Sequence, residues 1–263
     1  MKSLLIGLVA VANVWSAEQM RVQPVSRTPA ADTVKVVVAL PKSGAVLKGN
    51  PVWVQLRVDG FALGADSGQF DRADEIAVSG MGQTIHLVVD DMPYFAVNEP
   101  ALDPFNEQGF YYDTSYKFEI PKKLSKGLHV LRAFPARSYG ESLKGEKTFF
   151  ATTFYVGTNE DAKTIDLSKP YITYNEPSSQ MELSTEQPIL LDFYLSNCEL
   201  TSDGYRVRLS LDGNVHRILS VWVPYYIYGL SRGKHTVRLE LIDKHDKLVD
   251  GPYSDVSETI MVH

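Results

Sequence analysis

The sequence predicts an all-β protein built from two tandem antiparallel β-sandwiches. Short segments alternate apolar and polar side chains with a period of two, which is typical of half-buried strands. The chain has 14 Tyr, 11 Phe and 3 Trp, and aromatic enrichment favours pleated sheets over helices. No stretch shows sustained helical spacing. The length of 263 residues suits one large domain or two small ones.

Three sequence blocks recur in the same order in the two halves of the chain, and this duplication organises the whole prediction. The aligned pairs are residues 50–63 with 187–200, 82–90 with 204–212, and 124–134 with 230–240. Each block alternates like a strand: Val207, Leu209 and Leu211 share one face in the second copy. We therefore predict one sandwich over residues 33–157 and another over 170–263, joined by a polar linker at 158–169.

The third block carries the pattern Leu-x-x-Gly-x-His-x-(Leu/Val)-x-x-x-(Leu/Phe), at residues 124–134 and 230–241. In this pattern the chain resembles tandem bacterial immunoglobulin-like or fibronectin-type-III-like envelope modules. The resemblance covers residues 33–263 and implies immunoglobulin-like sandwiches. The Cys–Trp–Cys core of antibody domains is absent, so the likeness concerns architecture and carries function only weakly.

The N-terminus is typical of a secretory signal peptide. Lys2 is followed by an apolar stretch over residues 4–11 that is too short to span a bilayer, and small residues allow cleavage after Ala12 or Ser16. We expect the signal peptide to cover residues 1–17. The alternative is an N-terminus that is disordered or buried in the fold.

Residues 18–32 lack periodicity and are expected to form a flexible spacer. No other segment approaches about 18 uninterrupted apolar residues, so the mature chain is predicted to have no membrane span. Cys198 is the single cysteine and closes no internal disulfide. An exported chain without disulfides suits the bacterial periplasm, the cell envelope or secretion.

The composition excludes two classes of partner. The net charge is -6, and no cluster of Lys and Arg forms the basic surface that nucleic acid or an anionic membrane requires. We predict a protein or glycan partner instead.

The sequence shows no catalytic or metal constellation. His86 is predicted to point out of its sandwich and His129 inward. His235 repeats His129, which favours a shared structural role, an imidazole bonded to backbone at the core edge. The pair His235–His245 is the alternative metal site.

The remaining reactive groups also favour structural roles. Ser67 lies in an Asp-Ser-Gly segment like that of a serine-protease nucleophile, but no matching histidine segment precedes it. Cys198 has no basic neighbour to lower its pKa. We predict no catalytic residue, no cofactor and no metal ligand.

The first copy carries two insertions, over residues 59–81 and 92–114, rich in Asp, Gly, Phe and Tyr. Neither has the ordered acidic spacing of a calcium loop, so solvated acidic loops are favoured over a calcium site. Tyrosine runs at Tyr111–Tyr112 and Tyr225–Tyr226 are either binding platforms or half-buried core.

Immunoglobulin topology would bring the loops over residues 59–81 and 135–147 to one end of the first sandwich, distal to the second. Insertions at a free tip suit binding. The predicted ligand-binding residues at this tip are Phe70, Arg72, Arg137 and Tyr139.

These observations favour a non-enzymatic exported binding or adhesion module of the cell envelope. One alternative is a structural accessory or assembly protein of the envelope, and another is a metal-dependent or hydrolytic enzyme.

Overall fold

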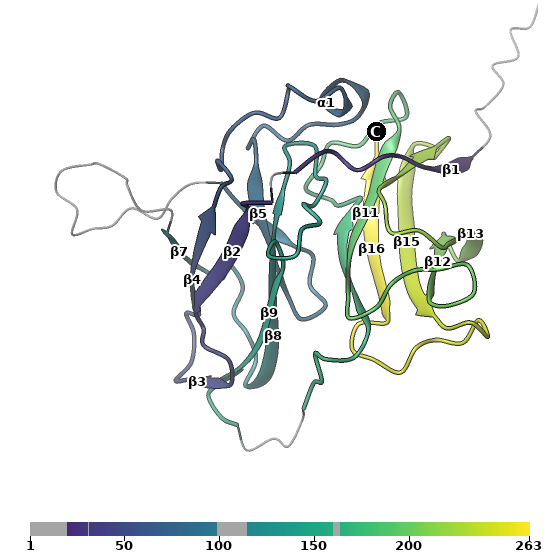
Figure 1. The fold of residues 1–263 in the computed structure, drawn as a ribbon. Coiled ribbons are helices and arrows are strands. Elements are labelled where there is room, and N and C mark those ends of the chain that lie inside the picture. The colour runs from purple at the N-terminus through teal and green to yellow at the C-terminus, as the bar shows by residue number, and fades with distance from the viewer. Residues whose placement is uncertain (1–19, 31, 99–114, 160–163) are drawn as a thin grey trace, which may run out of the picture.

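The computed structural model describes residues 20–30, 32–98, 115–159 and 164–263. These residues form two β-sandwiches that lie side by side (Figure 1). The predicted signal peptide and the tyrosines Tyr111 and Tyr112 fall outside the described residues. Within them, the one α-helix is α1 (Arg72–Glu75). The fold class predicted from alternation, all-β with two immunoglobulin-like antiparallel sandwiches, is confirmed.

The first sandwich pairs a three-stranded sheet with a five-stranded sheet. The smaller sheet has the order β2 (Lys35–Leu40), β4 (Trp53–Asp59), β7 (Ser115–Glu119). The larger has the order β3 (Ala45–Leu47), β9 (Phe150–Val156), β8 (Gly127–Ala136), β5 (Thr84–Val89), β6 (Phe95–Val97). Alternate apolar residues of the two sheets, such as Leu56, Leu87 and Phe154, meet in a core from which water is excluded.

The second sandwich has two four-stranded sheets. One has the order β1 (Arg21–Pro24), β14 (Tyr225–Tyr228), β11 (Ile189–Ser196), β10 (Tyr171–Glu176). The other has the order β13 (Asn214–Leu219), β12 (Arg206–Leu211), β15 (Gly233–Ile242), β16 (Asp255–Val262). Its core contains Phe193, Leu209 and Leu239 among other apolar side chains.

The two sandwiches repeat the same topology, as the duplication predicted. The aligned blocks contain the equivalent strands β4 and β11, β5 and β12, and β8 and β15. The order β2-β4-β7 corresponds to β10-β11-β14, and β9-β8-β5-β6 corresponds to β16-β15-β12-β13. Even the parallel pairing of β3 with β9 has a counterpart in the parallel bridge between Leu183 and Val262.

The repeated histidines confirm the structural role predicted for them. His129 Nδ1 lies 2.7 Å from the Asp90 carboxylate, and its Nε2 lies 2.9 Å from the backbone carbonyl four residues earlier. His235 makes the same contacts, at 2.7 Å to Asp212 and 2.8 Å to the carbonyl four residues earlier. Asp90 and Asp212 both have positive φ, 55° and 51°. Each aspartate therefore ties a turn to the strand that carries its histidine.

The flexible spacer predicted over residues 18–32 is wrong for the part that the structure describes. We call residues 20–30 the N-terminal arm; its strand β1 pairs antiparallel with β14, with Arg21 opposite Tyr228. Val22 is buried in the second core, and Arg217 donates a hydrogen bond to its carbonyl. One strand of four residues is too short to show a periodicity, so no pattern in residues 18–32 predicted it.

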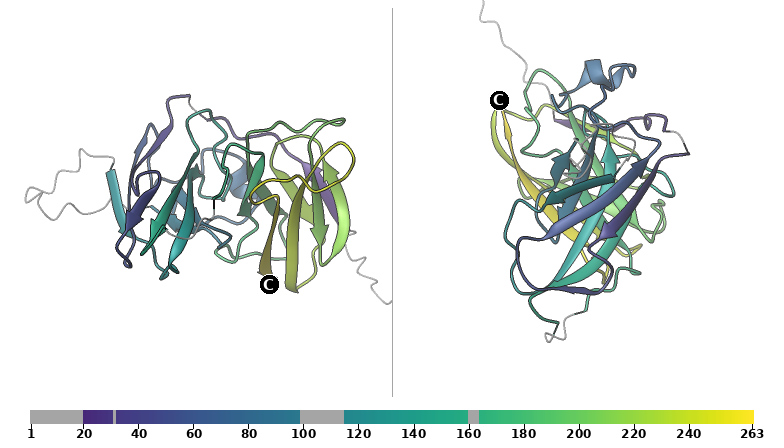
Figure 2. Two further views of the ribbon diagram at one scale, coloured as in Figure 1. Left: turned by 90° about the horizontal axis from the view of Figure 1, so that it is seen from below. Right: turned by 90° about the vertical axis from the view of Figure 1, so that its left-hand side faces the viewer.

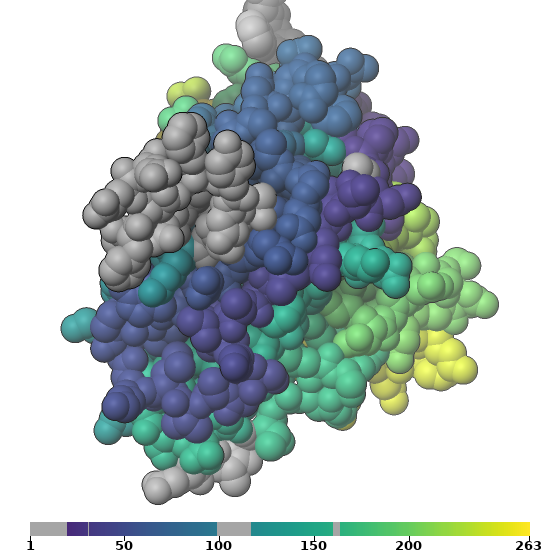
Figure 3. All heavy atoms as spheres, turned by 60° about the vertical axis from the view of Figure 1, so that its left-hand side comes forward, coloured from purple at the N-terminus to yellow at the C-terminus, as the bar shows by residue number. Residues whose placement is uncertain are grey.

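The N-terminal arm crosses from the second sandwich to β2 of the first, so it joins the two halves outside the interdomain linker (Figure 1). Seen from below, the two sandwiches stand next to each other with the arm running over both (Figure 2). In the space-filling view, the purple N-terminal residues lie next to the green residues of the second sandwich (Figure 3). The two sandwiches are in contact through two buried clusters, one around Tyr139 and Tyr226 and the other around Phe134 and Tyr194.

Candidate functional site

The four predicted tip residues do lie close together. The two loops that carry them share one end of the first sandwich, because Ser79 N donates to the Ser138 carbonyl at 2.7 Å. The Arg137 guanidinium lies 4.5 Å from the centre of the Phe70 ring. Loop convergence at this end is therefore as predicted.

This end is not a free tip, however, and the prediction that it lies distal to the second sandwich is wrong. Tyr139 is only 1% exposed and packs in a cluster with Ile76, Leu190 and Tyr226, the last two from the second sandwich. Its hydroxyl donates to Thr28 of the N-terminal arm at 2.8 Å.

The arginines of this end are also held within the chain. Arg72 forms an ion pair with Glu141 and donates to the Ser26 carbonyl, and Arg137 donates to Gln83 at 2.8 Å and to the Pro29 carbonyl at 2.8 Å. The N-terminal arm and β14 cover this end of the first sandwich, and no pattern in the sequence predicts that they lie there. Ligand binding by these four residues stays a prediction.

His86 points out of its own sandwich, as predicted, but it does not reach solvent. It is 3% exposed because the second sandwich covers that face of β5. Its ring stacks on Tyr94 with centroids 3.7 Å apart, and Nδ1 lies 2.7 Å from Asn175 Oδ1. Burial lowers the pKa of His86 to about 4. The imidazole is therefore neutral at pH 7 and acts as an interface side chain.

A buried polar network crosses the junction between the sandwiches. Asp192 of β11 is 0% exposed and accepts hydrogen bonds from the Ser142 hydroxyl at 2.6 Å and from Asn175 Nδ2 at 2.8 Å. Lys144 forms an ion pair with the same carboxylate and lies 3.0 Å from Ser142 Oγ.

The Ser142–Lys144 contact resembles a nucleophile–base pair, but both groups are committed to Asp192. The hydroxyl donates to this carboxylate and the ammonium is its ion-pair partner. An activated serine needs a base that is free to accept its proton. The arrangement is therefore that of a structural interface.

A second buried acid lies beside this network. Glu176 is 1% exposed and accepts a hydrogen bond from the Tyr94 hydroxyl at 2.7 Å. Burial raises the pKa of Glu176 to about 8. Its other carboxylate oxygen has no partner in the described part of the chain.

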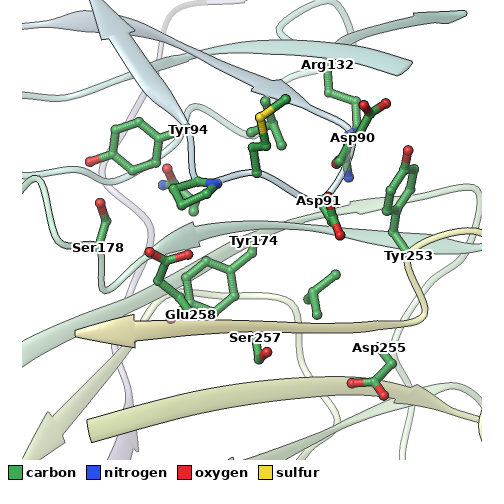
Figure 4. Close-up of a pocket in the computed structure, with 15 residues that line it drawn as sticks. Asp90, Asp91, Tyr94, Arg132, Tyr174, Ser178, Tyr253, Asp255, Ser257 and Glu258 are labelled. Atoms are coloured by element: carbon green, nitrogen blue, oxygen red, sulfur yellow. The ribbon is translucent and has the colours of Figure 1, made fainter. Parts of the chain in front are cut away.

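A cleft of about 180 Å³ opens where the two sandwiches meet, and we call it the junction cleft. The first sandwich lines it with the turn after β5 and with β8, and the second with β10, β16 and the loop before β16. The chemically distinctive residues that line it are Asp90, Asp91, Tyr94 and Arg132 from the first sandwich, and Tyr174, Tyr253, Asp255, Ser257 and Glu258 from the second (Figure 4).

Arg132 is the cation of this cleft and is almost completely buried, at 1% exposure. Its guanidinium lies 3.8 Å from the centre of the Tyr253 ring and donates to the carbonyls of Ile172 and Asp90. Burial lowers the pKa of Arg132. Burial likewise raises the pKa of Tyr253, to about 12, so its ring stays neutral beside the cation.

Sequence reasoning missed the junction cleft because its walls come from segments far apart in the chain, such as Asp91 and Glu258. One signal was present. Every residue of β5 and of β11 is buried, and β11 carries apolar side chains, Leu190 and Tyr194, on its outward face as well. Apolar residues on both faces are typical of a strand that is covered on both sides, so they indicated that this outward face packs on something.

The other predictions can be placed briefly. The described residues contain no group of three or more His, Cys, Asp or Glu that could hold a metal ion. Burial raises the pKa of the Cys198 thiol to about 12, which makes it a poor nucleophile at neutral pH. No helix in the described ranges is long and apolar enough to cross a membrane.

The comparisons with known proteins show no family. No family model matches the sequence, and no curated protein matches it.

Solved structures give loose likenesses only. The fibronectin(III)-like modules of Clostridium thermocellum CbhA are 15% identical, with 86% of this chain and 93% of that one covered and a TM-score of 0.28. Bacteroides ovatus SGBP-B, from a mixed-linkage glucan utilization locus, is 16% identical, with 87% and 47% covered and a TM-score of 0.20. Parabacteroides merdae β-glucuronidase is 9% identical, with 88% and 24% covered and a TM-score of 0.26. At these TM-scores the likenesses carry no functional argument.

Proposed function

We propose that the chain is an exported, non-enzymatic binding module of the cell envelope and that the junction cleft is its ligand site. The observation that carries the proposal is the composition of the cleft, whose walls come from two sandwiches fixed to each other by buried contacts. A concave site with convergent polar groups at a domain junction is where small ligand groups bind. Export rests on Lys2 and the apolar residues 4–11.

The fixed arrangement of the walls favours binding. Val88 and Phe134 of the first sandwich pack with Tyr194 of the second, and the Asp192 network lies beside them. A site that is formed before the ligand arrives loses less conformational entropy on binding. Ser142 and Lys144 are the groups most like a catalytic pair in the described residues. Their side chains are buried in that network and do not line the junction cleft.

Blocking the cleft tests the proposal. Ser257 is exposed on β16 and lines the cleft, so Ser257→Trp should fill it. Thr259 is exposed on the same strand and lies outside the cleft lining, so Thr259→Trp is the matched control. We expect a ligand found on a glycan or peptide array to bind the wild type and the control but not Ser257→Trp. Equal binding by all three proteins would remove the cleft as the site. Export is tested by cell fractionation and mass spectrometry. The chain should be recovered from the envelope fraction with the mass expected after removal of the signal peptide.

A second candidate function, a structural accessory protein of the envelope, is favoured by strand β13. This strand is the outermost of its sheet, and five of its six residues are exposed, including Val215 at 60%. A free strand edge can recruit a partner strand, and the same sandwich already pairs with β1 at another edge. Photo-crosslinking from position 215 in cells should capture a defined partner if this function is correct, and crosslinking from the exposed position 259 should not.

A further inference from the structure

Two of the four carboxylates that line the junction cleft are satisfied within the chain. Asp90 bonds His129 and accepts a hydrogen bond from Val130 N at 2.8 Å. Asp255 holds Arg238 through two contacts, at 2.7 and 2.6 Å. These two acids are therefore structural.

The other two, Asp91 and Glu258, form no hydrogen bond or ion pair in the described part of the chain. Asp91 is exposed and follows β5, whereas Glu258 lies on β16 and is half-buried. Figure 4 shows that they come from different walls of the cleft. Burial raises the pKa of Glu258 to about 7, which indicates that no cation in the described ranges offsets the loss of hydration of this carboxylate.

Arg132 does not supply that compensation. Its Nη atoms donate to the backbone carbonyls of Ile172 and Asp90 and to the Thr173 hydroxyl, and Tyr253 covers its face. Neither Asp91 nor Glu258 is therefore in direct contact with Arg132, although its charge attracts Asp91 through space, and both carboxylates can accept hydrogen bonds from a ligand.

The aromatic walls suit a cation as well. The hydroxyls of Tyr94 and Tyr174 are committed, the first to Glu176 and the second to the Pro177 carbonyl at 3.0 Å. Aromatic faces attract ammonium and guanidinium groups, and the cleft already holds one such pair in Arg132 and Tyr253.

The size of the cleft limits the ligand to one group. Its volume of about 180 Å³ lies below the range of about 300–1,000 Å³ that is usual for drug-sized ligands. A single side chain, or one end of a longer ligand, fits this space.

We infer that the junction cleft binds a single organic cation, an ammonium or guanidinium group on an aliphatic stem, between the carboxylates of Asp91 and Glu258. This inference rests on the proposed function, because it names the ligand class of the same site. The group can come from a basic side chain of a protein partner or from a free amine.

Nuclear magnetic resonance titration of the full chain at low salt tests the inference with three probes: acetyl-Gly-Lys-Gly-amide, the same peptide with norleucine in place of lysine, and cadaverine. We expect the lysine peptide and cadaverine to shift the amide signals of the cleft and the norleucine peptide to leave them unchanged. Tighter binding of the lysine peptide than of cadaverine identifies a side chain as the source, and the reverse order identifies a free amine. Equal binding of the norleucine peptide would overturn the inference.

Two double variants complete the test. Asp91→Asn with Glu258→Gln keeps the shape and removes the charge, and should weaken binding of the cationic probes about tenfold or more, as expected for the loss of charge-assisted contacts. The exposed acids Asp203 and Glu199 provide the control, as Asp203→Asn with Glu199→Gln. If the charge variant binds as well as the control while Ser257→Trp does not bind, the cation is wrong and the site stands. If Ser257→Trp also binds normally, both proposals fall.

Discussion

Replacing Lys144 with methionine should strongly destabilise the protein, because it leaves the buried Asp192 carboxylate without its ion-pair partner. Asp192 is 0% exposed, and the Lys144 side chain is 2% exposed. After the change, Asp192 would keep only uncharged donors, from Ser142 and Asn175. Removing one partner of a buried ion pair costs about 3–5 kcal/mol. That loss is a large share of the free energy of unfolding of a folded protein, which is about 5–15 kcal/mol.

Urea unfolding followed by circular dichroism and tryptophan fluorescence measures the effect. The chain offers a matched control in the exposed pair Lys169–Asp250, where the lysine and aspartate side chains are 43% and 100% exposed. Lys169→Met should leave the unfolding midpoint unchanged, since exposed pairs contribute little. The double variant Lys144→Met with Asp192→Asn should cost less than the two single changes together, because no charge is then left unpaired.

The location of the pair adds a second expectation. Lys144 belongs to the first sandwich and Asp192 to the second, so the loss should separate the unfolding of the two halves into two transitions. If Lys144→Met unfolds at the midpoint of Lys169→Met, in one transition, the network contributes no net stability and the reasoning is refuted.

Three further predictions concern other buried groups. Val22→Ala should lower the free energy of unfolding by about 1–2 kcal/mol, since it removes apolar surface from the second core; an unchanged urea midpoint would show that β1 adds no stability. His129→Gln and His235→Gln should each cost about 1–3 kcal/mol, and equal losses in thermal unfolding would confirm that the pairs Asp90–His129 and Asp212–His235 are equivalent. Glu176 has a pKa of about 8 against an ordinary 4.5, so its contribution to stability should fall as the pH rises from about 5 to about 8, and the lowered pKa of His86 opposes this fall only below about pH 6.5. Glu176→Gln should flatten that slope in melting temperatures measured from pH 5 to pH 9, and an unchanged slope would contradict the assignment.

Local patterns predicted the strands well, because alternation and turn residues act over a few neighbouring positions. The duplication gave the equivalent strands of both sandwiches and the common role of His129 and His235. The assumed immunoglobulin topology correctly placed the loops of Phe70 and Arg137 at one end of the first sandwich. Each of these predictions depends on contacts within one sandwich.

The contacts between the sandwiches escaped prediction, because they join residues that no period connects. Alternation placed His86 on an outward face, but it could not show that Asn175 of the other half covers this face. In the same way, no pattern around Tyr139 predicts its hydrogen bond with Thr28 of the N-terminal arm. The junction cleft exists only through such contacts.

The pairing of β1 with β14 also constrains the order in which the chain acquires its structure. Arg21 faces Tyr228, so the first described strand to leave the ribosome finds its partner only when most of the polypeptide has been synthesised. Contacts between residues so distant in sequence close late, because the entropy of loop closure opposes them. The second sandwich is thus complete only when the two ends of the chain are present together. Residues 20–24 should therefore be the last to gain protection in pulsed hydrogen exchange during refolding.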